Sequence, residues 1–571
     1  MRKKLFYIIL PVIIAVNSTF ASGKKPFPKN DFGLPFAGSN EIIGTYCELR
    51  PNHFHGGLDI RTGGVIGRPV LSVGDGYVSR INISTIGYGK AIYITHPNGY
   101  TSVYAHLSEF PATIQWFITK SQYQNQQYEI EIFPEADLIK VKRGETIAYS
   151  GNSGASQGPH LHFEIRETKS EAPVNPLLFG VIMQDHIAPS IFDVFLYKRD
   201  SLEKVYNGHF PSISLPTSSV QIVKKGKKKK KVFVPIGKHS IAFGSYAFGA
   251  TMRDYATSMS DNNGVNYVQL YLNDQLIYDC KLEEFMFSQM RMHNNYIDFK
   301  RMKQSGTKMH KLFKDNGSTL EFWNESPTDG WFTIDDTIAY HFRIVAKDVY
   351  GHSTEKKITL YGSPNGRNVI SYIQHNKSAS LCYANKDNLI SVNQDFKIGV
   401  PKNALYSDYQ LAYQKNYGIN YTIGNTLVPL DKKIDLHFRL SNEFVKYANK
   451  FTVFSADGRS YGTELQNQNW AVASVKEFGT YHIVLDTIKP NITPVAMNKN
   501  GYFSFQVSDG TSGIKDFDFY INGQWVLLEY DIGFIHGRIP NQLISGKHSI
   551  ELIVRDNRLN EKKFTKTITV P

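Results

Sequence analysis

Cysteine is scarce in this sequence, which has three such residues among 571: Cys47, Cys280 and Cys382. They are far apart, odd in number and lack the C-x-x-C spacing of thiolate metal sites. The sequence therefore has no disulfide framework and no cysteine-ligated structural zinc motif. Cys47 lies near a histidine-rich stretch and is a conceivable metal ligand there, but we expect it to be a buried free thiol.

Long apolar runs are absent beyond the N-terminus, which reads MRKKLFYIILPVIIAVNSTFASG. A basic start (2–4) precedes an apolar run (5–16), and the small residues Thr19 and Ala21 follow. The run has the length of a signal-peptide core and is short for a membrane span. We predict a signal peptide at 1–21 and an exported chain, in the periplasm or at the outer cell surface, with no membrane span after cleavage. The alternative is an uncleaved anchor.

Positive charge is abundant but is confined to two places. Of the net charge of +13, three charges lie in the predicted signal peptide and seven in KKGKKKKK (Lys224–Lys231), which leaves +3 for the rest. A nucleic-acid-binding protein would carry its basic residues over a surface, so the sequence predicts no nucleic-acid partner. The lysine run is either a contact for anionic envelope polymer or lipid head groups, or a solvated hairpin tip.

Long helical periodicities are scarce as well, whereas Tyr and Phe are abundant, with 34 and 36 residues. Aromatic residues favour strands, and turns such as Asp75-Gly76 and Asn98-Gly99 separate short alternating runs. The sequence predicts a mainly β protein with several domains. The expected segments are the signal peptide (1–21), a linker (22–40), a first domain (41–182) with an insertion (111–140), a β-sandwich with insertions (185–362), a β-rich domain (364–485) and a C-terminal β-sandwich (486–571).

A weak internal repeat links the second and the last of these segments. Both copies resemble immunoglobulin-type sandwiches, and the first copy carries a large insertion that contains the lysine run. The matching pairs are GVNYVQLYLNDQ (Gly264–Gln275) with GIKDFDFYINGQ (Gly513–Gln524), FRIVAKD ending at Asp348 with IELIVRD ending at Asp556, and DHIAP (Asp185–Pro189) with DTIKP (Asp486–Pro490).

Two short stretches gather metal-competent side chains. NHFHGGLDI contains His55 and Asp59, separated by two glycines that would let the chain bend so that both side chains converge. In GPHLHFEIR, a strand would place His160, His162 and Glu164 on one face and three apolar residues on the other. A further histidine, His106, ends a predicted strand.

Nitrogen and oxygen ligands without thiolate favour Zn²⁺, held by three protein side chains with one position open. Such an open site is catalytic, since the metal activates water and polarises a carbonyl, while further histidines serve as general base and oxyanion stabiliser. A lone His-x-His is more often a surface or core pattern, but the joint presence of both stretches favours a metal centre.

The segments HFHGGLDI, GYGKAIYITHPNGYTSVYAHLS and GNSGASQGPHLHFEIR occur in this order and together resemble lysostaphin-type (LytM-like) zinc metallopeptidases. The resemblance covers about 40–180. It implies an antiparallel β-sheet metallopeptidase domain at 41–182, followed by accessory sandwiches. It also implies one zinc ion bound by His55, Asp59 and His162, and the catalytic histidines His106 and His160.

The resemblance assigns less to the neighbouring side chains. His53 is expected to be a structural or second-sphere neighbour, and His96 has no catalytic role. Glu164 either orients a ligand or is simply a polar strand residue. The insertion departs from the family pattern, and its aromatic side chains are expected to form a wall or lid of the groove. They are Trp116, Phe117, Tyr123 and Tyr128.

The function implied is the hydrolysis of stem-peptide cross-links in peptidoglycan, for which we favour a D,D-endopeptidase. One alternative is a non-catalytic module that activates a partner hydrolase, but the five implied residues are all intact. Another is a zinc D,D-carboxypeptidase of a different pattern, which would use a Glu-x-x-His ligand element, whereas Gly158-Pro159 stands before the histidines here.

Overall fold

The computed structural model describes residues 27–38, 40–181, 185–199, 210–216, 218–225, 228–235, 237–255, 263–315, 317–324, 326–368, 379–497, 501–531, 533–538 and 544–570. The predicted signal peptide lies outside these residues. Antiparallel strands dominate the described chain, which confirms the mainly β prediction. None of the helices in this part of the chain has the length and apolar character needed to cross a bilayer.

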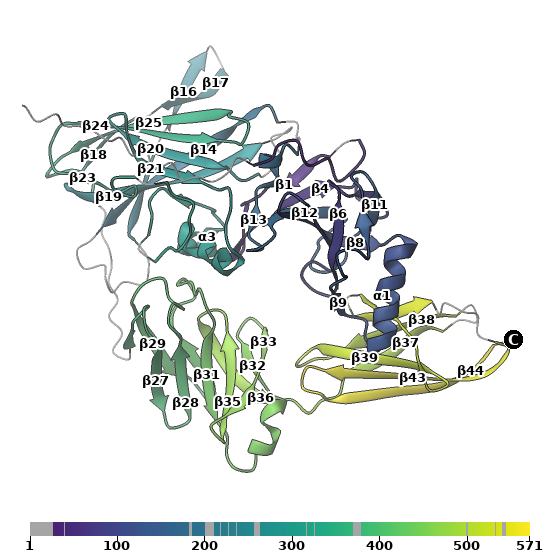
Figure 1. Cartoon of the computed structure of the whole chain (residues 1–571). Helices are drawn as coiled ribbons and strands as arrows, with labels where there is room; N and C mark the ends of the chain where they lie inside the picture. The colour runs from purple at the N-terminus through teal and green to yellow at the C-terminus, as the bar shows by residue number, and fades with distance from the viewer. Residues whose placement is uncertain are drawn as a thin grey trace, which may run out of the picture.

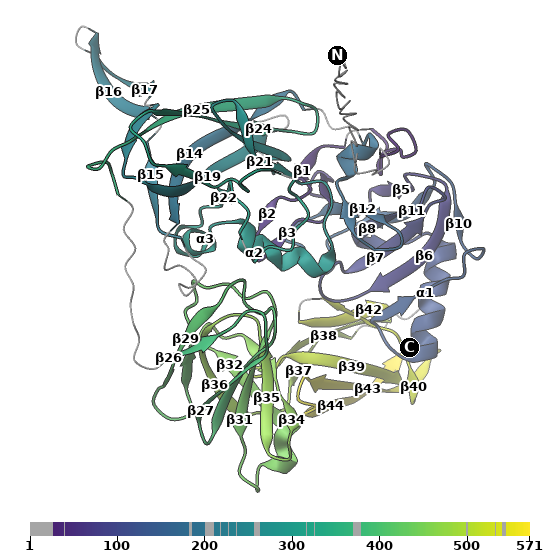
Figure 2. The same cartoon turned by 60° about the vertical axis from the view of Figure 1, so that its left-hand side comes forward.

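The described residues pack into four main hydrophobic cores, which define a first unit (27–181), a second (185–362), a third (379–485) and a fourth (486–570). Phe32 and Phe36, in the segment expected to be a linker, are buried in the core of the first unit. Figures 1 and 2 show these units arranged in a ring, with the fourth unit returning to the first. We propose that the units are the domains expected from the sequence.

The first unit is built on one large antiparallel sheet, whose buried face forms the core with Leu161, Phe163 and Ile165. The central position of β12 matters for function, because it places the His-x-His strand between two partners. The main path of the sheet is β1 (Ile42–Gly44), β4 (Leu58–Arg61), β12 (His160–Glu167), β8 (Tyr100–Glu109), β7 (Lys90–Thr95), β6 (Gly76–Ile83) and β10 (Lys140–Val141). The branches are β5 (Pro69–Leu71), β9 (Ile130–Ile132), β11 (Thr146–Ser150) and β13 (Pro173–Val174).

The expected insertion forms helix α1 (Ala112–Asn125) and then β9, which pairs with β6 at the sheet. The helix buries a single stripe, Ile114, Ile118 and Gln122, while Trp116 is exposed. Because the stripe is narrow and includes a polar residue, the helical period is weak in the sequence.

The second unit consists of two sheets that face each other across one core. One sheet has the order β15 (Ser212–Leu215), β14 (Ile187–Arg199), β19 (Gly244–Tyr255) and β22 (His310–Lys311), with β23 (Phe332–Ile334) beside β19. The other has the order β18 (Lys238–Ile241), β25 (Ser353–Gly362), β24 (Ala339–Lys347), β20 (Tyr267–Leu272) and β21 (Gln275–Lys281). Short helices α2 (His293–Tyr296) and α3 (Phe299–Ser305) lie at its lower edge in Figure 2.

A hairpin of the first unit is part of the core of the second. Strands β2 (Leu49–Arg50) and β3 (His53–Phe54) pair with each other and not with the main sheet. Tyr46, Cys47 and Phe54 are buried in the core of the second unit. The Phe54 ring lies 5.4 Å from that of Phe322 and 5.6 Å from that of Phe285, between ring centroids. The segment directly before His55 is thus held by the second unit.

The lysine run lies in a hairpin of the second unit. Its strands β16 (Ser218–Lys225) and β17 (Lys228–Pro235) pair with each other alone, and Figure 2 shows the hairpin projecting from the sandwich. The pairing of β16 with β17 forms the hairpin that the second interpretation expects. A contact of the lysine run with anionic polymer stays a prediction.

The third and fourth units are also two-sheet structures. One sheet of the third unit has the order β26 (Ala379–Cys382), β29 (Tyr409–Lys415), β30 (Tyr421–Ile423), β36 (Gly479–Leu485), β32 (Phe451–Ser455) and β33 (Ser460–Gly462). Its other sheet has the order β27 (Asn388–Asn393), β28 (Phe396–Val400), β31 (Ile434–Arg439), β35 (Trp470–Val475) and β34 (Glu464–Gln466). The fourth pairs β37 (Asn491–Met497), β38 (Tyr502–Ser508), β42 (Phe534–Arg538) and β41 (Glu529–Asp531), and β40 (Gln524–Trp525), β39 (Ile514–Ile521), β43 (Gly546–Asp556) and β44 (Glu561–Val570).

Polar and aromatic contacts connect the units around the ring. The helix of the insertion reaches the fourth unit, because the ring of Tyr123 meets that of Trp525 edge-on at 5.3 Å. Three side-chain hydrogen bonds between successive units are Arg291 Nε to Leu430 O (3.0 Å), Lys450 Nζ to Asn560 Oδ1 (2.8 Å) and Lys90 Nζ to Glu529 Oε2 (3.0 Å).

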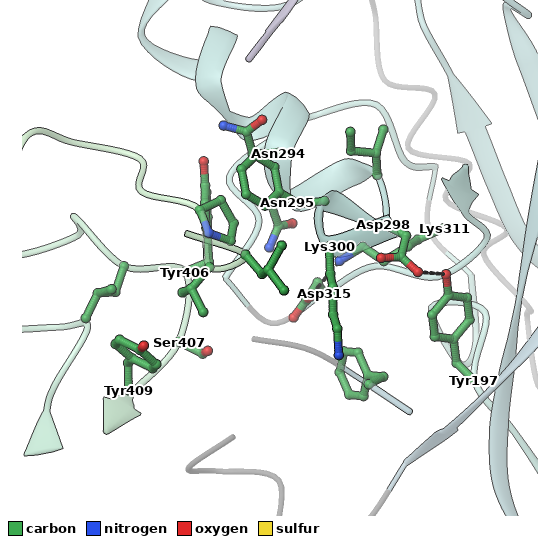
Figure 3. A pocket seen from close by; sticks show the side chains of 17 residues that line it. Tyr197, Asn294, Asn295, Asp298, Lys300, Lys311, Asp315, Tyr406, Ser407 and Tyr409 are labelled. Atoms are coloured by element: carbon green, nitrogen blue, oxygen red, sulfur yellow. Dashed lines mark hydrogen bonds and ion pairs between the residues drawn. The ribbon is translucent and has the colours of Figure 1, made fainter. Parts of the chain in front are cut away.

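A pocket lies between the second and third units (Figure 3). The polar groups on its second-unit side are engaged with one another: Tyr197 donates to Asp298 at 2.8 Å, and Lys311 pairs with Asp315 at 2.9 Å. Tyr406 faces them from the third unit. Neither histidine nor cysteine occurs among the described residues that line it, so the metal-competent groups must be sought elsewhere.

Candidate metal centre and active site

Three side chains of the first unit converge where β4 meets β12. Asp59 on β4 and His162 on β12 are direct cross-strand partners, and His55 precedes β4. Asp59 Oδ1 lies 2.9 Å from His162 Nδ1 and 3.1 Å from His55 Nε2, and these two nitrogens are 3.0 Å apart. All three residues are buried. The structure thus brings together the three ligands implied by the sequence.

Hydrogen bonds on the far sides of the imidazoles fix which nitrogen faces the cluster. His55 Nδ1 donates to the carbonyl oxygen of Thr45 at 2.8 Å, and His162 Nε2 donates to Glu164 Oε1 at 2.8 Å. When both imidazoles are neutral, the opposite nitrogens turn lone pairs toward each other and toward the carboxylate. Lone pairs that meet at such distances repel unless a cation lies among them, so this donor set fits Zn²⁺.

His106 and His160 lie beside this cluster. Their ring centroids are 4.8 Å apart, and His160 Nε2 is 3.5 Å from Asp59 Oδ1. Each is oriented by a backbone carbonyl at 2.8 Å from its Nδ1, that of Ser153 for His106 and that of Gly158 for His160. Both therefore direct Nε2 away from these carbonyls, and Nε2 of His160 faces the carboxylate of Asp59.

His106 adopts a backbone conformation that is unusual for its residue type. Its φ is +58°, in the left-handed region, near the end of β8. Such a conformation costs about 1–3 kcal/mol and is found most often at functional sites. The backbone N–H of His106 donates to the carbonyl of Tyr88, which holds the turned chain in place.

Glu164 connects the cluster to a buried cation. Its Oε1 accepts from His162 and from the hydroxyl of Tyr88 at 2.6 Å, and its Oε2 accepts from Arg166 Nε at 2.7 Å. Glu164 is fully buried. Of the two roles open from the sequence, the structure shows the orienting contact.

Arg50 binds the other side of the Asp59 carboxylate. Its guanidinium contacts Asp59 Oδ2 and also pairs with Glu48 at 3.2 Å. Arg50 comes from the hairpin that packs into the second unit. Since Oδ2 is taken, Asp59 offers Oδ1 to a metal ion.

The charges of the site are set by burial and by these partners. Burial disfavours a charge on His162, but the carboxylates of Asp59 and Glu164 outweigh it and raise its pKa to about 9. Burial also opposes the ionisation of Asp59, yet the surrounding imidazoles hold its pKa well below the ordinary value. The cluster therefore attracts positive charge. Burial, and then His162 and His160, lower the pKa of His106 to about 4, which keeps that imidazole neutral near pH 7.

The chain bends at Gly57, as expected, and Gly56 and Gly57 also serve the site in a second way. Neither has a positive φ, so no special conformation requires them. A Cβ on Gly57 would instead lie 2.3 Å from the carbonyl oxygen of Phe163, and one on Gly56 would lie 3.1 Å from Glu164 Oε1. The glycines allow the ligand loop to lie directly against β12.

The remaining named side chains lie outside the cluster. His53 Nδ1 is hydrogen-bonded to the backbone carbonyl of Pro51. The two ring nitrogens of His96 contact the backbone carbonyl of Asp75 and the hydroxyl of Ser102. Cys47 is a buried free thiol, as expected, and Cys280 and Cys382 are also free and buried.

The sequence reasoning missed several contributors. Arg50 lies outside the quoted motifs, whereas Tyr88 and Arg166 lie inside them but offered no pattern that distinguishes them from residues without a role at the site. For Arg166 the signal could have been the alternation of β12, which puts this residue on the same face as His162 and Glu164. For Thr45 and Ser153 the backbone carbonyl acts, so the residue type carries no signal.

With this geometry in view, the comparisons with known proteins are direct. The sequence model of peptidase family M23 matches residues 53–123 and 137–176. These ranges include the three clustered side chains and the two histidines beside them: His55, Asp59, His162, His106 and His160. The first unit belongs to peptidase family M23. The two matched ranges of the M23 domain are separated by residues 124–136, which lie within the expected insertion. A second model, that of a Zu5-like domain, matches 379–486 in the third unit.

Curated relatives match the M23 domain. DD-carboxypeptidase/endopeptidase Mpg of Neisseria meningitidis serogroup B is 36% identical over 111 residues, which are 19% of this chain and 20% of the relative. Peptidoglycan DD-endopeptidase ShyA of Vibrio cholerae is 30% identical over 151 residues, 26% of this chain and 29% of the relative. The matches thus span between a fifth and three tenths of the length of these two relatives.

Solved structures also match this part of the chain. The catalytic domain of a mutant of the prophage-encoded M23 protein EnpA from Enterococcus faecalis has 26% identity and a TM-score of 0.20, covering 26% of this chain and 98% of that one. The catalytic domain of lysostaphin from Staphylococcus simulans has 23% identity and a TM-score of 0.19, covering 24% and 91%.

Proposed function

We propose that this protein is an exported zinc metalloendopeptidase that hydrolyses peptide cross-links in peptidoglycan. The observation that carries the proposal is the convergence of His55, Asp59 and His162, with His106 and His160 at the rim of the same cluster. The family of the domain and relatives named as peptidoglycan endopeptidases support the substrate class.

In this proposal, His55, Asp59 and His162 hold one zinc ion per chain. When bound, zinc supplies Lewis acidity, which lowers the pKa of water and polarises a carbonyl. Glu164 keeps the proton of His162 on Nε2, and Arg50 keeps Asp59 to a single available oxygen. These contacts orient the ligands before the metal arrives.

His106 and His160 are the proposed proton-transfer groups. With Nδ1 donating to its carbonyl, the neutral form of either imidazole can accept a proton from the attacking water at Nε2 and then donate it to the leaving amine. The low pKa of His106 favours its neutral form, which suits a general base or a hydrogen-bond partner of neutral charge. Which of the two acts first is left open.

The bond attacked is proposed to be an amide. Glycosidases need two carboxyl groups that flank the scissile bond, one of them a proton donor. Here Asp59 faces the metal ligands and Glu164 is engaged on both oxygens, by His162 and by Arg166. Neither carboxylate is available for sugar chemistry, whereas a metal and two imidazoles suit amide hydrolysis.

Within this class we favour a D,D-endopeptidase that cuts the D-alanyl bond to the diamino acid of the neighbouring stem. The named D,D-activities of Mpg and ShyA support this choice. The predicted signal peptide supports export to the periplasm or outer surface. We also propose that the β16–β17 hairpin contacts anionic envelope polymer through its lysine run.

Digestion of purified sacculi tests the proposal. Mass spectrometry of the products should show conversion of dimeric muropeptides to monomers with new free amines and without new reducing sugar ends. Reducing ends without amines would refute the peptidase, and release of intact stem peptides from glycan would indicate an amidase. Loss of cross-links in the presence of a partner hydrolase, but not with this protein alone, would favour the non-catalytic module.

A further inference from the structure

Two clusters of carboxylates lie outside the M23 domain, one in the second unit and one in the fourth. In each unit one aspartate precedes the first strand, which is β14 or β37. A second ends or follows the neighbouring strand of the same sheet, β19 or β38. A third stands at the end of the strand that leads into the last hairpin, β24 or β43. The two sets are Asp185, Asp254 and Asp348, and Asp486, Asp509 and Asp556. Asp185, Asp348, Asp486 and Asp556 belong to the repeated sequence pairs.

The first aspartate of each set has the same hydrogen bonds. Asp185 Oδ1 accepts the backbone N–H of Ile187 at 3.1 Å, and Asp486 Oδ1 accepts that of Ile488 at 3.1 Å. In both aspartates the other carboxylate oxygen, Oδ2, is buried and has no hydrogen-bond partner among the described residues. Both units thus present a carboxylate oxygen that the protein does not use.

The last aspartate of each set is also held in the same way. Asp348 Oδ1 accepts the backbone N–H of His352, and its Oδ2 accepts the imidazole Nδ1 at 2.7 Å. Asp556 Oδ1 accepts the backbone N–H of Asn560, and its Oδ2 accepts the side-chain amide at 2.8 Å. A side-chain N–H donor at the fourth position downstream therefore orients the carboxylate in both copies.

The middle aspartate supplies a further unpartnered oxygen. Asp254 is 2% exposed, and its Oδ1 has no hydrogen-bond partner in the described chain. The next residue, Tyr255, pairs across the strands with Ile187, two residues after Asp185. Burial, and then the charges of Asp185 and Asp348, raise the pKa of Asp254 to about 8. Asp509 Oδ1 in the other copy is likewise buried and unpartnered. A buried carboxylate oxygen without a donor is costly, so such oxygens indicate a missing ligand.

The ligand that suits these groups is a hard cation. Ligand atoms of Asp185, Asp348 and His352 lie within 4.8 Å of one another, and so do those of Asp486, Asp509 and Asp556. Carboxylate oxygens at flexible strand ends favour Ca²⁺, whereas Zn²⁺ is usually bound with nitrogen or sulfur donors. Arg558 interacts electrostatically with Asp556 and Asp486, and its guanidinium donates to the backbone carbonyls of Asn449 and Phe451.

We propose that the second and fourth units each bind one Ca²⁺ ion through these three aspartates. His352 and Asn560 are positioning residues that hold the last carboxylate of each set. The ion would tie the entry point of each unit to two of its strand ends, because Asp185 follows the M23 domain and Asp486 follows the third unit. Extracellular modules bind Ca²⁺ with dissociation constants of about 10⁻⁴–10⁻³ M, so millimolar Ca²⁺ should fill both sites.

Equilibrium dialysis of the full-length, zinc-loaded protein against ⁴⁵Ca²⁺ tests the proposal. The expected stoichiometry is two Ca²⁺ per chain for the wild type, one for Asp254→Asn, one for Asp509→Asn and none for the double variant. Asp274→Asn is the matched control, since this aspartate is exposed at a hairpin tip of the second unit, and it should keep two. Failure of the wild type to bind Ca²⁺ at millimolar concentration, or two ions on the double variant, would overturn the proposal.

A second readout guards against misfolding of the variants. In the absence of Ca²⁺, Asp254→Asn should unfold at the same temperature as the wild type or at a higher one, because the substitution relieves repulsion among buried carboxylates. Addition of Ca²⁺ should raise the unfolding temperature of the wild type more than that of the double variant. An equal rise in both proteins would refute the assignment of these residues.

Discussion

Replacement of Glu164 by glutamine most directly tests the hydrogen bonds that orient His162 in the proposed metal site. Glu164 is fully buried between His162 and Arg166, and both of its oxygens accept hydrogen bonds. A glutamine side chain can still accept from His162 through its oxygen, but its amide group then faces the guanidinium, where two donors meet. Arg166 would be left as a buried cation without its partner.

Two independent arguments give the size of the effect. Arg166, His162 and Tyr88 outweigh burial and lower the pKa of Glu164 from 4.5 to about 2, which corresponds to about 3 kcal/mol in favour of the ionised form. Removal of one partner from a buried ion pair costs about 3–5 kcal/mol. We therefore expect Glu164→Gln to lose about 3–5 kcal/mol of unfolding free energy, and 10–100-fold in zinc affinity.

The sign of the pH dependence follows from the same shift. A carboxylate whose folded-state pKa is depressed contributes stability above its unfolded pKa, and this contribution is lost as the pH falls toward the folded value. For metal-free protein, the difference in stability between the wild type and Glu164→Gln should be complete above pH 5 and should shrink between pH 4.5 and about 2. The glutamine has no charge to lose in this range.

Chemical denaturation at several pH values measures the free energy, and competition with a chromophoric chelator measures zinc affinity. Glu167→Gln is the control, because this residue lies on the same strand but is partly exposed and bonds Ser170. It should change both quantities little. Equal zinc affinity and equal stability of Glu164→Gln and the wild type would show that the contact with His162 does not orient the ligand.

Three further predictions concern the ligands, the catalysts and the hairpin. His162→Ala should lose stoichiometric zinc in elemental analysis, and a variant that retained it would disprove the ligand assignment. His106→Ala and His160→Ala should keep zinc but lose about 10²–10⁴-fold in turnover of muropeptide dimers, and near-normal activity of either would remove its catalytic role. Phe54→Ala should lose about 3–5 kcal/mol of stability and also bind zinc less tightly, because the side chain anchors the loop before His55 in the core of the second unit. Phe342→Ala in the same core is the control: it should lose similar stability without weakening zinc binding in the folded state.

The strand pattern and the ligand motifs could be read from the sequence because they are local. The alternation His160, His162, Glu164 against Leu161, Phe163, Ile165 appears as a polar face and a core face of β12. The match of the first domain to family M23 confirms the resemblance. Local motifs suffice for these residues because Asp59 and His162 are cross-strand neighbours and His55 lies in the short loop that leads into β4.

Other features depend on contacts that the sequence does not display. Helix α1 has a narrow buried stripe with a polar member, so its period was hidden. The expectation that Trp116, Phe117, Tyr123 and Tyr128 form a groove wall stays a prediction, and the ring contact of Tyr123 is with Trp525 of the fourth unit. Arg50 reaches Asp59 from a hairpin whose position is set by the second unit, far away in the chain.

The burial of the β2–β3 hairpin in the second unit also sets an order of events during folding. The chain is synthesised from its N-terminus, so the M23 sequence is complete long before Phe285 and Phe322 exist to receive Phe54. Contacts so distant in sequence form late. We therefore expect the loop that carries His55 to reach its final place only after the chain has been synthesised beyond Phe322, so the proposed metal site would form late.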